Sequence, residues 1–116
     1  MNAIFHIDES ENWKITLANV QNMLAYAKQT EQKFFIEVLV NSIAVKQLKK
    51  DATASSGING PLMELLKNDV DIVACRNALN LYEIEAQELI SGVRIVPAGV
   101  VELVVKQNEG FAYIKP

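Results

Sequence analysis

Short apolar segments alternate with longer amphipathic stretches along this chain, the pattern expected of an α/β protein. Val70–Ala74 is apolar apart from Asp71 and rich in β-branched residues, which favours a buried strand. Polar Arg76 and Asn77 end the apolar run, so Cys75 is expected at the carboxyl end of this strand. The other segments predicted as strands are 3–8, 33–40, 93–96 and 111–116.

Four helices are predicted to connect these strands. An apolar stripe at helical spacing predicts a helix over 11–29. Pro61 fits the first turn of a second helix, which ends before residue 70. Two more helices are expected, over 81–90, with Gly92 just past its end, and over 100–107. The β-branched residues of 100–107 would also suit a strand, but a strand there would leave parallel neighbours without a crossover.

Several local expectations accompany these elements. Asp8 is expected to cap the first helix, with Glu11 completing a capping box. Glu37, the one charge inside its strand, should lie at a solvated edge or find a partner. A short helical piece is expected within 41–50, and the small polar residues of 51–57 predict a mobile loop.

The alternating order of strands and helices predicts a mostly parallel sheet with helices on both faces. Right-handed crossovers would place all the carboxyl strand ends at one edge, where open α/β sheets bind their ligands. The residues expected at this edge are Asp8, Asn41, Cys75, Asn77 and Pro97, with His6 close by.

Composition narrows the class of protein. With 116 residues, 50% of them hydrophobic, the chain suits one packed domain spanning 1–116. The net charge of −3 gives no basic footprint for nucleic acid. No apolar run is long enough to span a membrane, and no secretory signal is visible. A single cysteine permits no internal disulfide, which fits a cytoplasmic location.

The sequence also lacks the motifs of several enzyme classes. One histidine and one cysteine make a multi-cysteine zinc site implausible, so no metal is expected. The glycines at 57 and 60 lack the Lys-Ser/Thr ending of a phosphate loop, and no Gly-x-Ser-x-Gly elbow is present. No dinucleotide fingerprint follows the first strand, and no cofactor is expected.

Cys75 is the candidate for chemistry at the sheet edge. Backbone N–H groups at the start of the following helix, together with Arg76, would favour its thiolate form, and a thiolate can accept sulfur as a persulfide. Asn77 and Asn41 could donate hydrogen bonds to a bound anion. His6 could carry a proton if it reaches this edge.

Each of these residues also has a purely structural interpretation. A lone cysteine at the end of an apolar strand is often an inert, small core residue. His6 could be a packed, hydrogen-bonded side chain, Asp8 only a helix cap, and Asn77 only a turn residue.

Several segments together resemble the DsrE/DsrF-like family. They are Ile4–Asp8 with Trp13, Cys75–Leu79, Val96–Leu103 and Gln107–Pro116. The resemblance covers nearly the whole chain and is weakest over 41–60. It implies a three-layer α/β/α sandwich with a mostly parallel five-stranded sheet, in a small cytoplasmic protein that forms a homo-oligomer, often a trimer or hexamer.

Characterised relatives relay sulfur as a persulfide on a cysteine at the end of the third strand, and Cys75 falls on that position. Sulfur-relay subunits tend to follow this cysteine with an alanine-rich turn and an Arg-Gly pair. Here Arg76–Tyr82 lacks that pair, so the chain looks more like the simpler branch of the family, most of whose members have no assigned activity.

Two hypotheses follow. In the first, the protein is a sulfur carrier with Cys75 as persulfide acceptor, His6 as proton relay, and a sulfur donor or acceptor protein as partner. In the second, it is a non-catalytic homo-oligomeric binding module with a pocket for a small ligand or protein at the sheet edge. Because the helix after Gly99 is apolar around much of its circumference, we expect it to form the interface between copies.

Overall fold

Five parallel strands form the centre of the computed structural model, which describes residues 1–116. Their order across the sheet is β4-β3-β2-β1-β5, and every neighbouring pair is parallel. The strands are β1 (Asn2–Ile7), β2 (Phe35–Val40), β3 (Asp71–Cys75), β4 (Arg94–Val96) and β5 (Ala112–Ile114). The parallel five-stranded sheet expected from the sequence is therefore confirmed.

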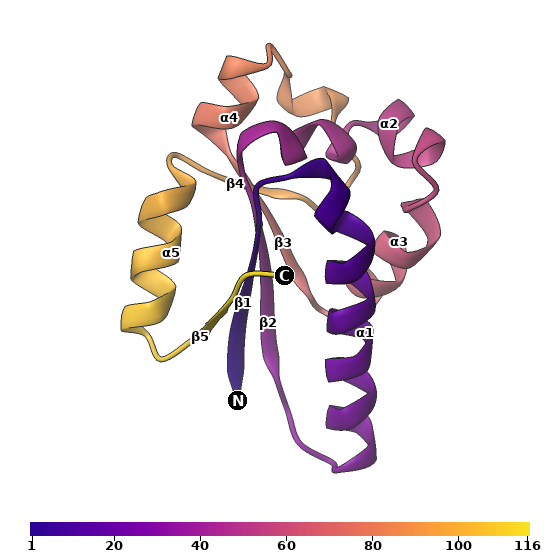
Figure 1. Cartoon of the computed structure of the whole chain (residues 1–116), viewed down its shortest axis with the longest axis vertical. Coiled ribbons are helices and arrows are strands. Elements are labelled where there is room, and N and C mark those ends of the chain that lie inside the picture. Colours follow the sequence, from indigo (N-terminus) through magenta and orange to yellow (C-terminus); the bar gives the residue numbers. More distant parts are fainter.

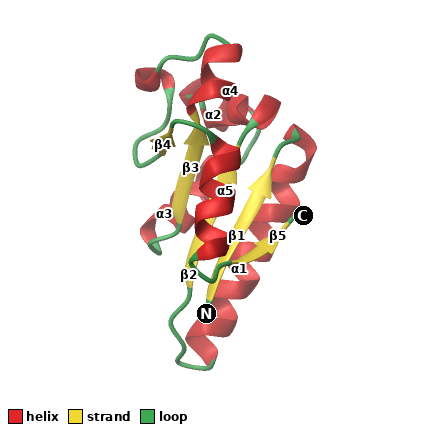
Figure 2. Cartoon of the chain, turned by 90° about the vertical axis from the view of Figure 1, so that its left-hand side faces the viewer, coloured by secondary structure: helices red, strands yellow, loops and turns green.

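The helices form two layers, one on each face of the sheet. Figure 1 shows α1 and α3 on one side of the sheet and α5 on the other, and Figure 2 shows α5 in front of the strands. The α-helices are α1 (Trp13–Gln29), α2 (Lys50–Ser55), α3 (Asn59–Lys67), α4 (Arg76–Leu81) and α5 (Gly99–Asn108). Three 3-10 segments complete the chain: η1 (Ser10–Asn12), η2 (Ser42–Leu48) and η3 (Ala86–Glu88).

Strand order explains why α5 lies alone. From β1 to β4 each strand is laid beside the one before, so right-handed crossovers keep α1 and α3 on one face. The chain then returns across the whole sheet from β4 to β5, and this return places α5 on the opposite face. None of the helices is long and apolar enough to cross a membrane.

The core is divided between the two faces of the sheet. The larger part lies under α1 and α3 and includes Trp13, whose Nε1–H donates to the carbonyl of Ala44 over 3.0 Å. The smaller part lies under α5. It consists of Ile4, Leu39, Val73, Val96 and Leu103. Side chains alternate between the two faces along a strand. The residue two positions after each of the four strand residues of this smaller core therefore also faces α5, at the carboxyl edge of the sheet.

Two predicted segments are wrong. The chain turns into α4 directly after Cys75, so the helix lies over Arg76–Leu81 and not over 81–90. Glu83 adopts a positive φ of 55°, which stops the helix, and only η3 follows. Ile84 and Leu89 are buried all the same, in an irregular segment.

The predicted loop over 51–57 is mostly the short helix α2. The hydroxyl of Thr53 is buried and donates to the carbonyls of Gln47 and Lys49, which fixes this helix against η2. The expected helical piece within 41–50 is present as η2.

The predicted helix cap at Asp8 is also wrong. The chain enters η1 and then α1 without any side-chain cap. The carboxylate of Asp8 instead accepts a hydrogen bond from Lys115 Nζ over 2.6 Å.

Candidate functional site

Cys75 lies where β3 ends and α4 begins, in contact with the first residue of α5. The Gly99 N–H donates to the Cys75 Sγ over 3.2 Å. The thiol is buried, with 6% of the residue exposed. Because Gly99 is the first residue of a ten-residue helix, its N–H carries the partial positive charge of the helix N-terminus. The sulfur thus accepts a hydrogen bond from the N-terminus of α5.

A shallow pocket of about 270 Å³ opens beside the thiol at the carboxyl edge of the sheet. Segments following β2, β3 and β4 contribute its walls, as expected of parallel strands that end at one edge. The lining residues are Asn41, Ser42, Cys75, Asn77, Ala78, Leu81, Ala98, Gly99 and Val100. Asn41, Cys75 and Asn77, three of the candidates from the sequence, are thus brought together.

Glycine at position 99 lets α5 start close to the sheet. A Cβ at this position would lie 3.2 Å from the Cβ of Cys75, 3.4 Å from the Cβ of Asn41 and 3.1 Å from Leu39 Cδ1. Such approaches are tighter than ordinary van der Waals contact. The missing side chain therefore allows the helix N-terminus to reach the sulfur.

His6 lies next to this pocket without lining it. Its Nε2 lies 2.9 Å from Asn41 Oδ1, and its Nδ1 lies 2.6 Å from the hydroxyl of Tyr113 on β5. His6 therefore reaches the Cys75 pocket only through the side chain of Asn41.

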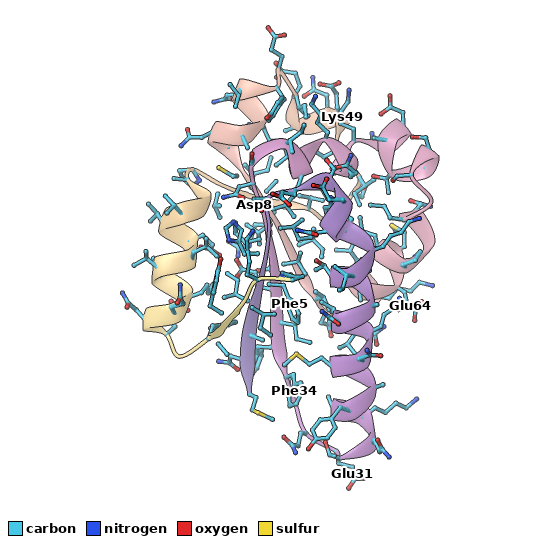
Figure 3. The ribbon with its side chains drawn as sticks, viewed as in Figure 1. Phe5, Asp8, Glu31, Phe34, Lys49 and Glu64 are labelled. Carbon is cyan, nitrogen blue, oxygen red and sulfur yellow. The ribbon has the colours of Figure 1, made fainter.

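Asp8 and Arg76 do not line the pocket. Figure 3 shows Asp8 at the same end of the sheet as Lys49, far from Glu31 at the opposite end. The ammonium of Lys115 beside Asp8 holds the pKa of this carboxyl below its ordinary value. The side chain of Arg76 is exposed, on the first residue of α4.

Two residues at this edge were missed by the sequence reasoning. Pro97 was expected at this edge, and because Gly99 lies two positions after it, the sequence could have placed Gly99 beside the end of β3. Tyr113 gave no comparable signal, because its contact with His6 depends on β5 pairing with β1.

A cluster of charged side chains joins α5 to the opposite end of the same face. Arg94 Nη2 lies 2.7 Å from Asp71, 2.9 Å from Glu102 and 3.5 Å from Glu37. Glu37 is only 2% exposed. Of the two expected outcomes, a solvated edge or a charged partner, the structure shows the second. The other close cation of Glu37 is Lys106, whose Nζ lies 3.9 Å from Glu37 Oε1.

The carboxylates of this cluster differ in how readily they ionise. Burial, and then the neighbouring Glu102, raise the pKa of Glu37 to about 8. Burial alone would also raise the pKa of Glu102, but hydrogen bonds with Glu37 and Arg94 outweigh it and hold that pKa below its ordinary value. These opposite shifts favour the protonated form of Glu37 and the ionised form of Glu102.

The geometry at Cys75 suits nucleophilic sulfur chemistry more than metal binding. No group of three or more His, Cys, Asp or Glu side chains comes close enough together to hold a metal ion. A cysteine sulfur with a helix N–H donor and an adjacent open pocket can act as a thiolate nucleophile.

Comparisons with known proteins agree with this architecture. The family model described as the DsrE/DsrF-like family matches residues 2–116. A solved structure of a protein of unknown function, MTH1491 from Methanobacterium thermoautotrophicum, is similar with 32% identity and a TM-score of 0.86, covering 99% of this chain and 98% of that one.

A second solved structure shares the fold alone. It is a conserved protein of unknown function, BT1422 from Bacteroides thetaiotaomicron, with 16% identity and a TM-score of 0.71, over 99% of this chain and 94% of that one. No curated protein matches the chain.

Proposed function

Because this chain belongs to the DsrE/DsrF-like family, we propose that it is a sulfur carrier that holds sulfane sulfur as a persulfide on Cys75. One observation carries the proposal: the Cys75 Sγ accepts the first N–H of α5 at the floor of an open pocket. A buried cysteine with a purely structural role has no need of a helix N-terminus aimed at its sulfur.

The reaction transfers one sulfur atom without net oxidation. The Cys75 thiolate attacks the outer sulfur of a persulfide donor, and a new sulfur–sulfur bond forms as the donor's own sulfur–sulfur bond breaks. The donor leaves as a thiolate and takes up a proton from water. Attack on Cys75 persulfide by an acceptor thiolate reverses these steps and regenerates the Cys75 thiolate.

The pocket offers hydrogen-bond donors where the transferred sulfur would lie. The persulfide is one sulfur atom longer than the thiol, and the outer sulfur carries the negative charge. The side-chain amides of Asn41 and Asn77 line the pocket beside Cys75 and could donate to this anion. A reducing cytoplasm would keep the thiol free between cycles.

Labelled sulfur tests this proposal. The protein is incubated with a persulfide donor whose outer sulfur is radioactive, and bound label is measured before and after reductant. We expect label on the wild type that dithiothreitol releases, and none on Cys75→Ser. Label that persists on Cys75→Ser, or an unlabelled wild type, would contradict the proposal.

We also propose that copies of the chain associate through the outer face of α5. Val100, Val101 and Val104 are 65%, 57% and 53% exposed there, although α5 lies over a core. Val100 also lines the Cys75 pocket, so a second copy on this face would narrow the opening. A trimer or hexamer, as the family resemblance implies, would bury these valines.

The alternative function is a non-catalytic homo-oligomeric binding module. The low exposure of Cys75 and the exposed valines of α5 favour it. In that case the pocket holds a small ligand or a protein segment, and Cys75→Ser leaves the fold, assembly and binding intact. The labelling experiment distinguishes the two functions, because only the sulfur carrier takes up sulfur.

A further inference from the structure

Tyr113, His6 and Asn41 form a chain of hydrogen bonds that ends at the Cys75 pocket. Tyr113 belongs to β5, His6 to β1 and Asn41 follows β2, so the chain crosses three adjacent strands. The two contacts are 2.6 Å from Tyr113 Oη to His6 Nδ1 and 2.9 Å from His6 Nε2 to Asn41 Oδ1.

The direction of these hydrogen bonds follows from the chemistry of the groups. An amide oxygen can only accept, so with Asn41 Oδ1 facing the ring, the imidazole proton of neutral His6 lies on Nε2. Nδ1 is then an acceptor, and the Tyr113 hydroxyl donates to it. Both ring nitrogens of His6 have a partner in this arrangement.

This arrangement fixes the orientation of the Asn41 amide beside the pocket. Because Oδ1 is directed to His6, the amide nitrogen takes the other position. Asn41 lines the pocket with Cys75, and the Cβ atoms of both lie within 3.4 Å of the point that a Cβ on Gly99 would occupy. The two N–H groups of Asn41 donate to no protein atom and are available to a bound anion.

We propose that Tyr113 and His6 are positioning residues that hold the Asn41 amide with its N–H groups toward the Cys75 pocket, where they bind anionic sulfur or another small anion. The inference rests on the proposed function for the identity of that anion. It gives His6 a role through its fixed tautomer, so that His6 need not touch the reacting sulfur.

The aromatic contact between Tyr113 and His6 does not by itself explain the geometry. Their ring centroids lie 5.7 Å apart, a contact that phenylalanine would make equally well. Tyr113 is 43% exposed, so its hydroxyl could have bonded water instead. Replacing Tyr113 by phenylalanine therefore removes the hydrogen bond and keeps the packing.

The first arm of the test reads the His6 tautomer by ¹⁵N NMR. His6 is the only histidine in the chain, so its ring signals need no further assignment. We expect the Nε2–H form in the wild type at a pH where the ring is neutral. A wild-type ring protonated on Nδ1 would mean that the Asn41 amide faces the other way and would overturn the inference. This arm needs no variant and no sulfur donor.

The second arm measures alkylation of Cys75, the only cysteine, by anionic iodoacetate and neutral iodoacetamide. The ratio of the two rates cancels any change in thiolate content and reports how well the pocket accepts an anion. We expect Tyr113→Phe and Asn41→Ala each to lower this ratio roughly threefold or more, as loss of one charge-assisted hydrogen bond predicts. Tyr26→Phe, an exposed tyrosine on α1, is the matched control and should leave the ratio unchanged.

The outcomes separate this inference from the proposed function. The wild type could take up no labelled sulfur and still show the Nε2–H tautomer, with lowered ratios in the two variants. That result would contradict the sulfur-carrier proposal and support an anion site. An unchanged ratio in both Tyr113→Phe and Asn41→Ala would overturn the positioning role, even if the wild type carries sulfur.

Discussion

The Gly99 N–H lies 3.2 Å from the Cys75 Sγ, which joins the first residue of α5 to the last residue of β3. This contact requires the helix to start directly against the sheet, where any side chain at position 99 would be crowded. The chemistry proposed for Cys75 and the packing of α5 therefore depend on the same residue.

Substitution of Gly99 by alanine tests this dependence. The new Cβ would lie 3.1–3.4 Å from Leu39, Cys75 and Asn41, so α5 or these neighbours must move by a few tenths of an ångström. We expect Gly99→Ala to lower the free energy of unfolding by about 1–3 kcal/mol in urea denaturation and to slow alkylation of Cys75. Gly60→Ala on α3 is the control for reactivity: whatever its own effect on stability next to Pro61, it should leave the alkylation rate of Cys75 unchanged. A Gly99→Ala protein as stable and reactive as the wild type would contradict the tight approach.

Glu37 should make stability depend on pH above the acid range. Its pKa is raised from 4.5 to about 8, so between these values the folded protein binds a proton that the unfolded chain has lost. Stability from this group is complete below 4.5 and is lost as pH rises through 8. We expect the free energy of unfolding to fall over this window in the wild type.

The variant Glu37→Gln isolates this effect, because glutamine has nearly the same shape and cannot ionise. Its stability should be nearly flat over the same window. The lowered pKa values of Asp8 and Glu102 act only in more acidic solution and leave the comparison undisturbed. A slope equal to that of the wild type would show that another group titrates.

Arg94 should contribute more to stability than Lys115, although both form ion pairs. Arg94 contacts three carboxylates, one of which belongs to the buried Glu37. Because its side chain is half-exposed, we expect Arg94→Met to cost only about 1–3 kcal/mol in urea denaturation. Lys115→Met removes one exposed pair with Asp8 and should cost less. Equal losses in the two variants would argue against a distinct stabilising effect of the charged cluster around Arg94.

The outer face of α5 should control assembly. Val101→Asp places a charge on the proposed interface without touching the core, since Val101 is 57% exposed. We expect it to shift the protein toward monomer in sedimentation velocity while leaving the unfolding midpoint within a few degrees. Ile15→Asp is the matched control, 52% exposed on α1 at the opposite face of the sheet. Normal assembly of Val101→Asp, or equal loss in both variants, would rule out α5 as the interface.

The sequence was sufficient for the parts of the fold that depend on hydrophobic pattern. The strand ending at Cys75 and the long helix over 11–29 are strongly patterned, and both are present. The choice of helix for 100–107 followed from the need for a crossover, and α5 confirms it. These features are encoded locally or by general rules of topology.

The remaining features depend on tertiary contacts that the local sequence does not reveal. The helix after Cys75 is short because Glu83 adopts a left-handed conformation. Glutamate rarely adopts this conformation, so the sequence did not predict it. Aspartate is a residue type that often caps helices, but the partner of Asp8 is Lys115, 107 residues away in the sequence. The contact of Tyr113 with His6 likewise depends on the last strand of the chain, β5, pairing with the first, β1.

The most direct test of the sulfur-carrier proposal is the intact mass of the protein after incubation with a persulfide donor, for the wild type and Cys75→Ser. We expect a single addition of about 32 Da on the wild type, reversed by reductant and absent from Cys75→Ser. No addition to the wild type, with Cys75 also resistant to alkylation in the folded protein, would contradict the account and leave Cys75 as a structural residue.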